Sequence, residues 1–486
     1  MIPLKQLREN KAAALEGLQR RNFKELELVD TLLAADEKRR KTQTELDSQL
    51  AEANQLAKEI GQLFKSGKAQ EAQGLTERSA VLKTSTKALQ EEMQSLEKEI
   101  LELRYQIPNV PQASVPAGNS EEDNEELEKG GTMPTLAEGA LPHWELAKKY
   151  DLIDFDLGSK ITGAGFPVYK GKGARLQRAL INYFLDKNTA AGYREMQVPH
   201  LVNEASGYGT GQLPDKEGQM YHVTGDDLYL IPTAEVPLTN MYRNVLLEEK
   251  ELPIAVTGYT PCFRREAGSY GAHVRGLNRL HQFDKVEIVR LETQERSNAA
   301  LEEMMQHVKG ILAELDLPYR VLRLCGGDLG FTSALTYDFE MYSAAQEKWL
   351  EISSVSTFEG YQAERLQLRY RTKDGQKQNV HTLNGSSLAL PRVLATLLEN
   401  CQTPEGIILP KVHVMAPAKW KKGWFAGTDT FKFEGTVREK AKKQLIPNSK
   451  FDSRYQMIID KKPLNTKCFI QLTPVVTGEV ITYRLA

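Results

Sequence analysis

Three short segments of the sequence bring together hydroxyl, carboxylate and guanidinium groups that can bind a small polar substrate and a nucleotide. The first is Thr233-Ala234-Glu235, where a hydroxyl and a carboxylate stand two residues apart. Side chains two apart share one face of a strand, so the pair predicts a polar site on that face or at the strand's end. The same residues also suit a helix N-cap followed by an acidic first turn, which carries no chemistry.

The second segment runs from Phe263 to Glu287. Arg264 and Glu266 are two residues apart, so on a strand their side chains point the same way. A guanidinium can clamp a phosphate while the neighbouring carboxylate accepts a hydrogen bond from an amino group, and this arrangement suits ATP. The glycine-containing loop at 267–278 suits a flap over a substrate. The alternative is a salt-bridged surface hairpin that binds nothing.

The third segment lies between residues 351 and 392. Glu351 and Ser354 offer the hard oxygen ligands that Mg²⁺ prefers. Arg392 is predicted on a helix that follows a turn of small residues at 384–387, from where it can reach a triphosphate. Together the three segments predict a site for a nucleotide, a divalent cation and a small polar substrate.

The elements that must position these residues are predicted from the apolar pattern. Short apolar segments at 196–199, 228–231 and 286–289 predict strands, and the periodicity at 174–186 predicts a helix. Because strands and helices do not alternate regularly, the pattern favours an α+β fold over a doubly wound sheet. The sequence contains no P-loop motif and no strand-linked Gly-x-Gly-x-x-Gly motif, so neither nucleotide-binding fold is supported.

A proline-free stretch at 23–104 has apolar positions spaced by alternating steps of three and four. The glycine-containing segment 65–68 interrupts it, so we predict two long antiparallel helices packed as a coiled-coil hairpin. Such a hairpin either reaches a large partner or serves as a dimerisation element or spacer. The predicted contact positions are Val29, Leu32, Asp36, Arg39, Gln43, Leu46, Leu50, Ala53, Ala57, Ile60 and Phe64, then Leu75, Leu82, Leu89, Leu96 and Leu103.

Composition sets broad limits on the protein class. A chain of 486 residues with 41% apolar and 26% charged residues predicts about three folded domains. No apolar run is long enough for a membrane span and the N-terminal residues do not resemble a signal peptide, so a cytoplasmic protein is expected, with no membrane partner. The four cysteines lie more than sixty residues apart, so neither structural zinc nor a disulfide framework is expected.

The net charge of −2 hides an uneven distribution along the chain. Residues 1–110 hold 18 basic and 18 acidic side chains, residues 411–486 hold 15 and 6, and the remainder holds 30 and 41. A basic segment is the kind of surface that meets phosphate. The basic cluster at 38–41, by contrast, is more typical of a solvated helix face.

Prolines, glycines and the acidic stretch 121–128 predict a linker after the hairpin. The predicted organisation is a hairpin domain at 1–110, a linker at 111–142, a catalytic domain at 143–412 and a basic C-terminal extension at 413–486. The extension contains strand-like segments at 456–460 and 469–473 and several aromatic residues, among them Trp420 and Trp424.

Five segments resemble those of bacterial-type seryl-tRNA synthetases, and the resemblance covers about residues 1–411. It implies a class II catalytic core built on an antiparallel sheet, preceded by a hairpin that grips tRNA. The segments at 263–271 and 381–392 resemble class II motifs 2 and 3, and 196–199 resembles the end of motif 1. The five segments are TAEVPLTN at 233–240, FRREAGSYG at 263–271, HQFDKVE at 281–287, EISSVSTFEGYQAERLQLRYR at 351–371 and HTLNGSSLALPR at 381–392.

The resemblance also implies roles for individual residues. As catalytic groups, Arg264 would hold the α-phosphate of ATP, Glu266 the adenine amino group and Arg392 the γ-phosphate. Pro199 would lie at a homodimer interface. The implied serine-binding residues are Thr233, Ala234, Glu235, Arg264, Glu287 and Ser386. The implied ATP-binding residues are Arg264, Arg265, Glu266, Glu351, Ile352, Ser353, Ser354 and Arg392, with Glu351 and Ser354 coordinating Mg²⁺.

The implied activity is the ATP-dependent activation of L-serine to seryl-adenylate and transfer of the seryl group to tRNA(Ser), with tRNA(Sec) as a second substrate to be tested. Two rivals are an amino acid ligase that loads a carrier protein and an inactive RNA-binding paralogue. Three departures from the family stand out. The motif 2 loop carries Ala272-His273-Val274 where charged residues are common, motif 3 has Ser387 and Pro391 where glycines are commoner, and residues 413–486 extend beyond the usual end.

Overall fold

The computed structural model describes residues 1–266 and 275–410, and four short strands further along the chain. Two compact units are present, Met1–Val412 and His413–Ala486. The described part of the second unit is a sheet of order β19-β22-β21-β20, in which β20 and β21 coincide with the strand-like segments of the sequence. These strands are β19 (Lys432–Phe433), β20 (Tyr455–Ile459), β21 (Cys468–Pro474) and β22 (Ile481–Leu485).

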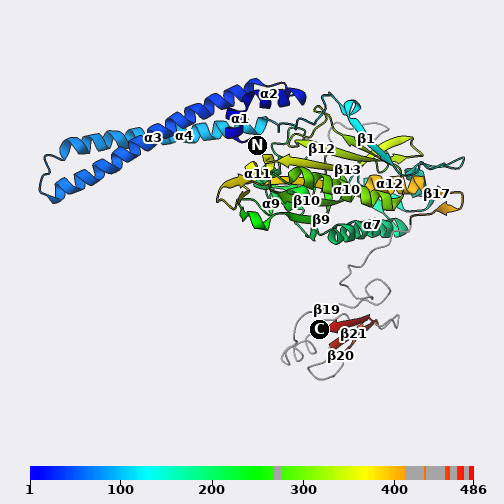
Figure 1. Cartoon of the computed structure of the whole chain (residues 1–486). Coiled ribbons are helices and arrows are strands. Elements are labelled where there is room, and N and C mark those ends of the chain that lie inside the picture. The colour runs from blue at the N-terminus through cyan, green and yellow to red at the C-terminus, as the bar shows by residue number, and fades with distance from the viewer. Residues whose placement is uncertain (267–274, 411–431, 434–454, 460–467, 475–480, 486) are drawn as a thin grey trace. The chain divides into compact units, whose positions relative to one another are not determined.

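The predicted helical hairpin is confirmed. Helix α3 (Glu27–Lys65) and helix α4 (Gln73–Gln106) run side by side, joined by a short connection that contains Gly67 (Figure 1). Polar pairs set their antiparallel register, because Lys38 pairs with Glu92 at 2.8 Å near the base and Arg78 pairs with Glu52 at 2.8 Å further out.

The contact stripe of α3 follows the prediction near the base and departs from it in the outer half. Val29, Leu32 and Leu46 are buried as expected. Further out, Leu50 is 36% and Phe64 57% exposed, whereas Leu56 is only 9% exposed. Beyond position 39 the stripe therefore keeps Leu46 but contains Thr42 and Leu56 in place of the predicted Gln43 and Ala57, because polar residues there leave the choice between a step of three and a step of four open.

All four side chains of the basic cluster at 38–41 are engaged in ion pairs within the hairpin. The carboxylate of Asp36 is completely buried and is held by Arg8 at 2.6 Å, Arg39 at 2.8 Å and Arg40 at 3.3 Å. The cluster therefore compensates acidic neighbours, which agrees with a structural role.

The base of the hairpin is fixed to the catalytic part of the first unit. Helices α1 (Leu4–Glu9) and α2 (Lys11–Arg20) pack there in a cluster that includes Val29, Ile100 and Tyr361. The buried guanidinium of Arg21 donates to four backbone carbonyls, those of Asn109, Leu329, Gly330 and Ser333. Because the four N–H donors of Nη1 and Nη2 are matched by fixed backbone acceptors, this contact anchors the segment that leads into the hairpin.

The catalytic part is built on an eight-stranded sheet in the described residues, of order β1-β11-β12-β13-β16-β10-β9-β4. All neighbours are antiparallel except β4 and β9, so the predicted α+β fold with an antiparallel sheet is confirmed. The strands are β1 (Glu125–Gly130), β4 (Arg194–Glu195), β9 (Ile254–Phe263), β10 (Gln282–Glu292), β11 (Tyr319–Arg323), β12 (Leu335–Ser343), β13 (Lys348–Glu359) and β16 (His381–Ala389).

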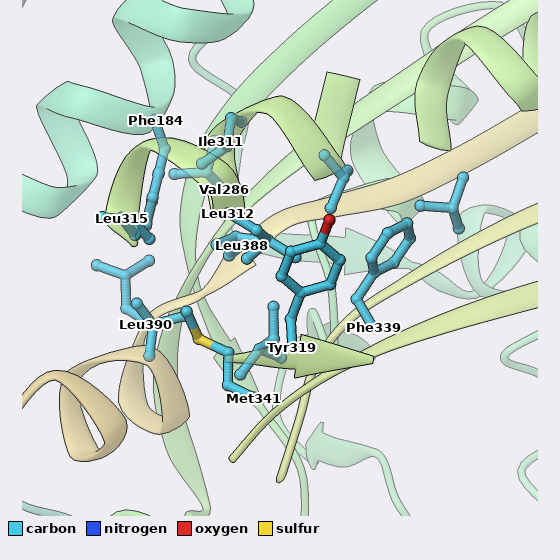
Figure 2. Close-up of a cluster of buried hydrophobic side chains, with 14 of the residues drawn as sticks. Phe184, Val286, Ile311, Leu312, Leu315, Tyr319, Phe339, Met341, Leu388 and Leu390 are labelled. Carbon is cyan, nitrogen blue, oxygen red and sulfur yellow. The ribbon is translucent and has the colours of Figure 1, made fainter. Parts of the chain in front are cut away.

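Helices α7 (Gly171–Ala190), α10 (Ser297–Leu315) and α12 (Leu390–Asn400) pack on this sheet and form the main core. Apolar side chains from the three helices meet those of the strands, so the face of the sheet that they cover is dry. Figure 2 shows part of this cluster, with Phe184, Ile311, Leu312, Leu315, Leu390, Val286, Tyr319, Phe339, Met341 and Leu388 labelled.

Two local expectations need correction. Strand β4 ends at Glu195, so the strand predicted at 196–199 is wrong. The backbone N–H of Met196 still donates to the carbonyl of Thr257 at 2.7 Å. Further along, Pro199 has no backbone N–H to donate. In the segment 111–142, β1 forms an edge strand of the main sheet that the sequence pattern did not indicate. Its acidic side chains pair with basic ones, for example Glu128 with Lys309 at 2.6 Å.

The remaining elements surround the sheet. Within the described residues no helix is long and apolar enough to cross a membrane. The other helices are α5 (His143–Lys149), α6 (Phe155–Ile161), α8 (Glu204–Thr210), α9 (Glu235–Asn240), α11 (Tyr361–Leu366), η1 (Glu121–Asp123) and η2 (Glu249–Glu251). The other strands are β2 (Ile153–Asp154), β3 (Val168–Tyr169), β5 (Leu201–Asn203), β6 (Tyr221–Val223), β7 (Leu228–Leu230), β8 (Leu246–Glu248), β14 (Arg369–Arg371), β15 (Lys377–Asn379), β17 (Gln402–Thr403) and β18 (Gly406–Ile407).

Candidate active site

Thr233 and Glu287 form the centre of a buried polar cluster. The hydroxyl of Thr233 donates to Glu287 Oε2 at 3.2 Å and accepts from Lys285 Nζ at 2.8 Å. Lys285 Nζ also lies 2.5 Å from Glu287 Oε2. In the register of the sheet Glu287 stands opposite Ser386, so strand pairing brings a third predicted residue to the same place.

Glu235 lies in the first turn of α9, not on a strand, so the helix-start alternative is right about the helix and its acidic first turn, while the N-cap residue is Ala234 and forms no side-chain cap. Its backbone N–H donates to the Thr233 hydroxyl, while Ala234 is fully buried beside it. Burial, reinforced by the nearby negative charge of Glu287, raises the pKa of Glu235 to about 7. A carboxylate in this state is stabilised by any cation that arrives, including the ammonium group of an amino acid.

Arg264 follows the last residue of β9, so the expectation that Arg264 and Glu266 lie on a strand is wrong. The backbone N–H of Arg264 still pairs with the carbonyl of His281 at 2.9 Å, and its guanidinium stacks over the ring of Phe283 at 5.3 Å. The guanidinium also acts electrostatically on Glu235. Arg264 is half-buried and acts on both buried carboxylates, Glu235 and Glu287, so its guanidinium is available near them to meet a bound anion.

Glu266 adopts a left-handed backbone conformation, with φ of 49°, and its carboxylate pairs with Arg279 at 2.9 Å. Its neighbour Arg265 has an exposed side chain. Glu266 lines a cavity of about 730 Å³, and none of the other predicted site residues belongs to the lining of this cavity. Aromatic and charged side chains share the lining, among them Trp144, Phe155, Phe166, Arg275, Arg279 and His281.

A β-bulge at Ile352 brings Glu351 and Ser354 to one face of the sheet. Residues three apart normally point to opposite faces of a strand. Here Ser354 pairs with Asp338 and Glu351 pairs with Glu340, and these two partners are two apart on β12. The extra residue therefore restores the common face. Burial raises the pKa of Asp338 well above its ordinary range, with the charge of Glu351 adding to the effect.

Arg392 lies in the first turn of α12, as predicted, and its side chain contacts Glu351. Its Nη1 lies 3.3 Å from Glu351 Oε2, and its Nε donates to the carbonyl of Asn278 at 2.9 Å. The structure thus joins two residues that the resemblance assigned to ATP. The small-residue segment at 384–387 lies within β16 and is not the turn that the sequence pattern suggested.

Two residues of the predicted ATP set face away from the site. Ile352 is 1% exposed and belongs to the main core. The hydroxyl of Ser353 donates to the backbone carbonyl of Ser386 at 2.5 Å. Both therefore support the strands, and any contact of theirs with a nucleotide is through the backbone. Ser387 is accommodated by a 2.7 Å hydrogen bond to Asn188, and Pro391 suits the first turn of α12.

Four residues of the site were missed by the sequence argument. Lys285 carried a usable signal, because it stands two residues before Glu287 and shares its strand face. Phe283 and Asp338 gave only a generic strand pattern. Gln362 gave no signal, because it reaches Glu235 across 127 residues of sequence.

Family models match both parts of this arrangement. Residues 1–111 match the seryl-tRNA synthetase N-terminal domain, and residues 221–401 match the tRNA synthetase class II core domain (G, H, P, S and T). The serine–tRNA ligase of Salinibacter ruber is 49% identical over 409 residues, which is 84% of this chain and 96% of that protein. The chain belongs to the seryl-tRNA synthetase family. The serine–tRNA ligase of Pseudothermotoga lettingae is 42% identical, with 85% and 97% covered.

Solved structures of seryl-tRNA synthetases share the fold. The Pyrococcus horikoshii enzyme complexed with ATP has a TM-score of 0.79 at 32% identity, and the alignment covers 85% of this chain and 97% of that one. The cytoplasmic serine–tRNA ligase of Naegleria fowleri in complex with AMP has a TM-score of 0.75 at 26% identity, with 85% and 96% covered. The alignments leave part of this chain unmatched. The unusual motif 2 loop Ala272-His273-Val274 lies outside the described residues.

Proposed function

We propose that this synthetase activates L-serine with ATP to seryl-adenylate and transfers the seryl group to tRNA(Ser). The observation that carries the proposal is the buried cluster of Thr233, Glu235 and Glu287 beside Arg264, in a chain whose relatives are named serine–tRNA ligases. A carboxylate pair suits the substrate ammonium and hydroxyl groups, and the guanidinium suits the phosphate where the reaction occurs.

Catalysis then rests on positioning and charge stabilisation. Arg264 holds the α-phosphate, Glu266 accepts from the adenine amino group and Arg392 binds the γ-phosphate, after its ion pair with Glu351 is exchanged for the nucleotide. Since the arginines neutralise charge that develops as the serine carboxylate attacks phosphorus, no covalent enzyme intermediate is needed. Phe283 offers an aromatic face for the adenine ring.

Mg²⁺ fits the acidic face of β12 and β13. Asp338 is half-buried, and its buried Oδ1 has no hydrogen-bond partner, next to the charge of Glu351. In the described residues no group of three His, Cys, Asp or Glu side chains is arranged to hold a metal by itself. A magnesium ion that shares ATP phosphates needs only one or two protein ligands, and we assign these to Glu351 and Ser354. The ion would neutralise charge on the triphosphate.

Discrimination among amino acids follows from the same buried cluster. Thr233, Glu287 and Ser386 offer polar groups that a serine hydroxyl can satisfy, whereas alanine would leave them unpaired. An unpaired buried polar group costs about 1–3 kcal/mol, or roughly one to two orders of magnitude in kcat/KM. The described residues therefore supply selectivity without an editing step.

The partners follow from the fold and its relatives. The hairpin of α3 and α4 is assigned to tRNA(Ser), with tRNA(Sec) as a further substrate to be tested. A homodimer is proposed because apolar side chains lie exposed around the end of motif 1, including Leu201, which is 42% exposed two residues after the exposed Pro199. A cytoplasmic location is supported by the cytoplasmic relative from Naegleria fowleri.

The decisive experiment for the function is serine-dependent exchange of pyrophosphate into ATP by the purified chain, followed by charging of tRNA(Ser). We expect exchange with L-serine and transfer to tRNA(Ser). Exchange without transfer to tRNA would favour the ligase that loads a carrier protein. Absence of exchange, with tRNA binding retained, would favour the inactive paralogue.

The pH dependence of serine use tests the role of Glu235. The pKa of this carboxyl is raised to about 7, so the ionised form that binds the substrate ammonium is present above pH 7 and is lost as the pH falls through 7. We expect kcat/KM for serine in the exchange reaction to fall about tenfold per pH unit well below 7. Glu235→Gln should raise the KM for serine and remove this limb. If the fall of kcat/KM at low pH is unchanged in Glu235→Gln, the titrating group is not Glu235.

The C-terminal extension allows two interpretations, because its side chains lie outside the described residues. Its basic balance and aromatic residues suit a small nucleic-acid-binding module, and the same composition suits a dispensable tail. The four-stranded sheet of its described strands is compatible with a folded module.

Deletion of residues 413–486 separates the two. A module that binds RNA should, when removed, raise the KM for tRNA and flatten its dependence on salt, since fewer counterions are released on binding. The measurement is aminoacylation kinetics across a salt series. An unchanged KM for tRNA with an unchanged salt dependence would contradict the RNA-binding module and favour the dispensable tail.

A further inference from the structure

Gln362 is a buried glutamine whose amide is completely engaged. It lies on α11 and is 1% exposed. Its Nε2 donates to Glu235 Oε1 at 2.6 Å and to the carbonyl of Thr210 at 3.2 Å, and its Oε1 accepts from the Thr382 hydroxyl at 2.7 Å. A backbone carbonyl can only accept, so the Thr210 contact determines which end of the amide carries nitrogen.

The charge state of the Glu235 carboxylate depends on this amide because the other charged groups near Glu235 have opposite signs. Glu287 faces it with a negative charge, while Lys285 and Arg264 act on it with positive charges. Burial and Glu287 raise the pKa of Glu235, and the hydrogen bond from Gln362 acts in the opposite direction by favouring the ionised form. Without the amide, a buried carboxylate oxygen would lose a short hydrogen bond.

The support that carries Gln362 is itself rigid. On either side of Gln362, Tyr361 donates its hydroxyl to the carbonyl of Ile107 at 2.7 Å, and Glu364 pairs with Arg104 at 2.8 Å. Both partners belong to the base of the hairpin. The position of the amide is therefore fixed from outside the substrate pocket.

We propose that Gln362 is a positioning residue for amino acid binding, which holds the Glu235 carboxylate where it receives the ammonium group of the substrate. This rests on the proposed function, because it assumes that Glu235 contacts serine. Gln362 does not itself touch the substrate. Its loss should consequently affect serine and leave ATP binding unchanged, which a general loss of structure would not do.

The test is steady-state pyrophosphate exchange by full-length Gln362→Leu, with serine and ATP varied separately. We expect the KM for serine to rise at least tenfold, the KM for ATP to stay within twofold, and the acid limb of kcat/KM for serine to move to higher pH. Equal changes in both KM values, or an unmoved limb, would overturn the proposal. Gln177→Leu is the matched control: Gln177 is also buried and donates to a carboxylate, that of Asp284 at 2.8 Å, away from Glu235. It should leave the KM for serine unchanged.

Thr382 provides a second route if Gln362→Leu proves too unstable to assay. Thr382→Val removes the hydroxyl that fixes the amide, whereas Thr382→Ser keeps it. The valine variant should raise the KM for serine and the serine variant should not; an equal effect of both would contradict the proposal. Wild-type protein without serine-dependent exchange would refute the proposed function itself, whereas wild-type exchange with an unchanged KM in Gln362→Leu would refute only the role of Gln362.

Discussion

Replacing Arg264 by alanine is expected to abolish adenylate formation while leaving the fold intact. The guanidinium is the group best placed to meet the α-phosphate, because it stacks on the ring of Phe283 and acts on the buried carboxylate of Glu235. Leaving a largely buried charge uncompensated costs about 3–5 kcal/mol. That cost corresponds to a loss of roughly 10²- to 10⁴-fold in exchange rate.

The measurement is serine-dependent exchange by Arg264→Ala and Arg264→Lys, with melting temperatures to verify folding. Lysine keeps the charge but not the planar fork, so it should recover only part of the activity. Arg369→Ala is the control, because Arg369 lies on β14 in a separate three-stranded sheet and donates to Gln367. An exchange rate of Arg264→Ala within tenfold of the wild-type rate would contradict the role assigned to Arg264.

Shortening the hairpin is expected to separate the two half-reactions. The base must be kept, because Val29, Leu32 and Ile100 belong to the cluster that anchors it and Arg104 pairs with Glu364. Residues 43–88 can be replaced by a short glycine-containing turn, since α3 and α4 are antiparallel at this level. No residue assigned to chemistry precedes Thr233, so adenylate formation should be retained.

Charging of tRNA(Ser) by the shortened protein should fall at least a hundredfold in kcat/KM, mostly through a higher KM for tRNA. The physical reason is the loss of the binding surface that orients a large substrate. Exchange assayed on the same preparation serves as the control for folding. Normal charging by the shortened protein would show that the hairpin is only a spacer.

Sequence patterns predicted the features that have a regular period. The two hairpin helices and the helix at 174–186 are confirmed, because a helical period repeats there over many residues. The strands at 228–231 and 286–289 are confirmed from short apolar segments. The apolar pattern gave wrong contact positions where a single residue changes the helix face that is buried. The stripe of α3 departs from the prediction after position 39, where polar residues hide the step.

The site shows the same limit. Glu287 and Ser386, which the resemblance assigned to serine, lie opposite each other on neighbouring strands. The bulge at Ile352, which brings Glu351 and Ser354 to one face, adds a single residue to one strand and leaves no periodic signal. Gln362 reaches Glu235 through tertiary packing alone. Such contacts depend on the fold as a whole and cannot be obtained from local spacing.

The most direct test of the central claim is the charging of purified tRNA(Ser) by the full-length protein with ATP, Mg²⁺ and labelled L-serine. The buried carboxylates proposed to select serine and the hairpin assigned to its tRNA must both act in this reaction. We predict serine esterified to tRNA(Ser), with labelled L-threonine and L-alanine giving no comparable product. Failure to charge tRNA(Ser), in a preparation that still exchanges pyrophosphate with serine, would contradict the account.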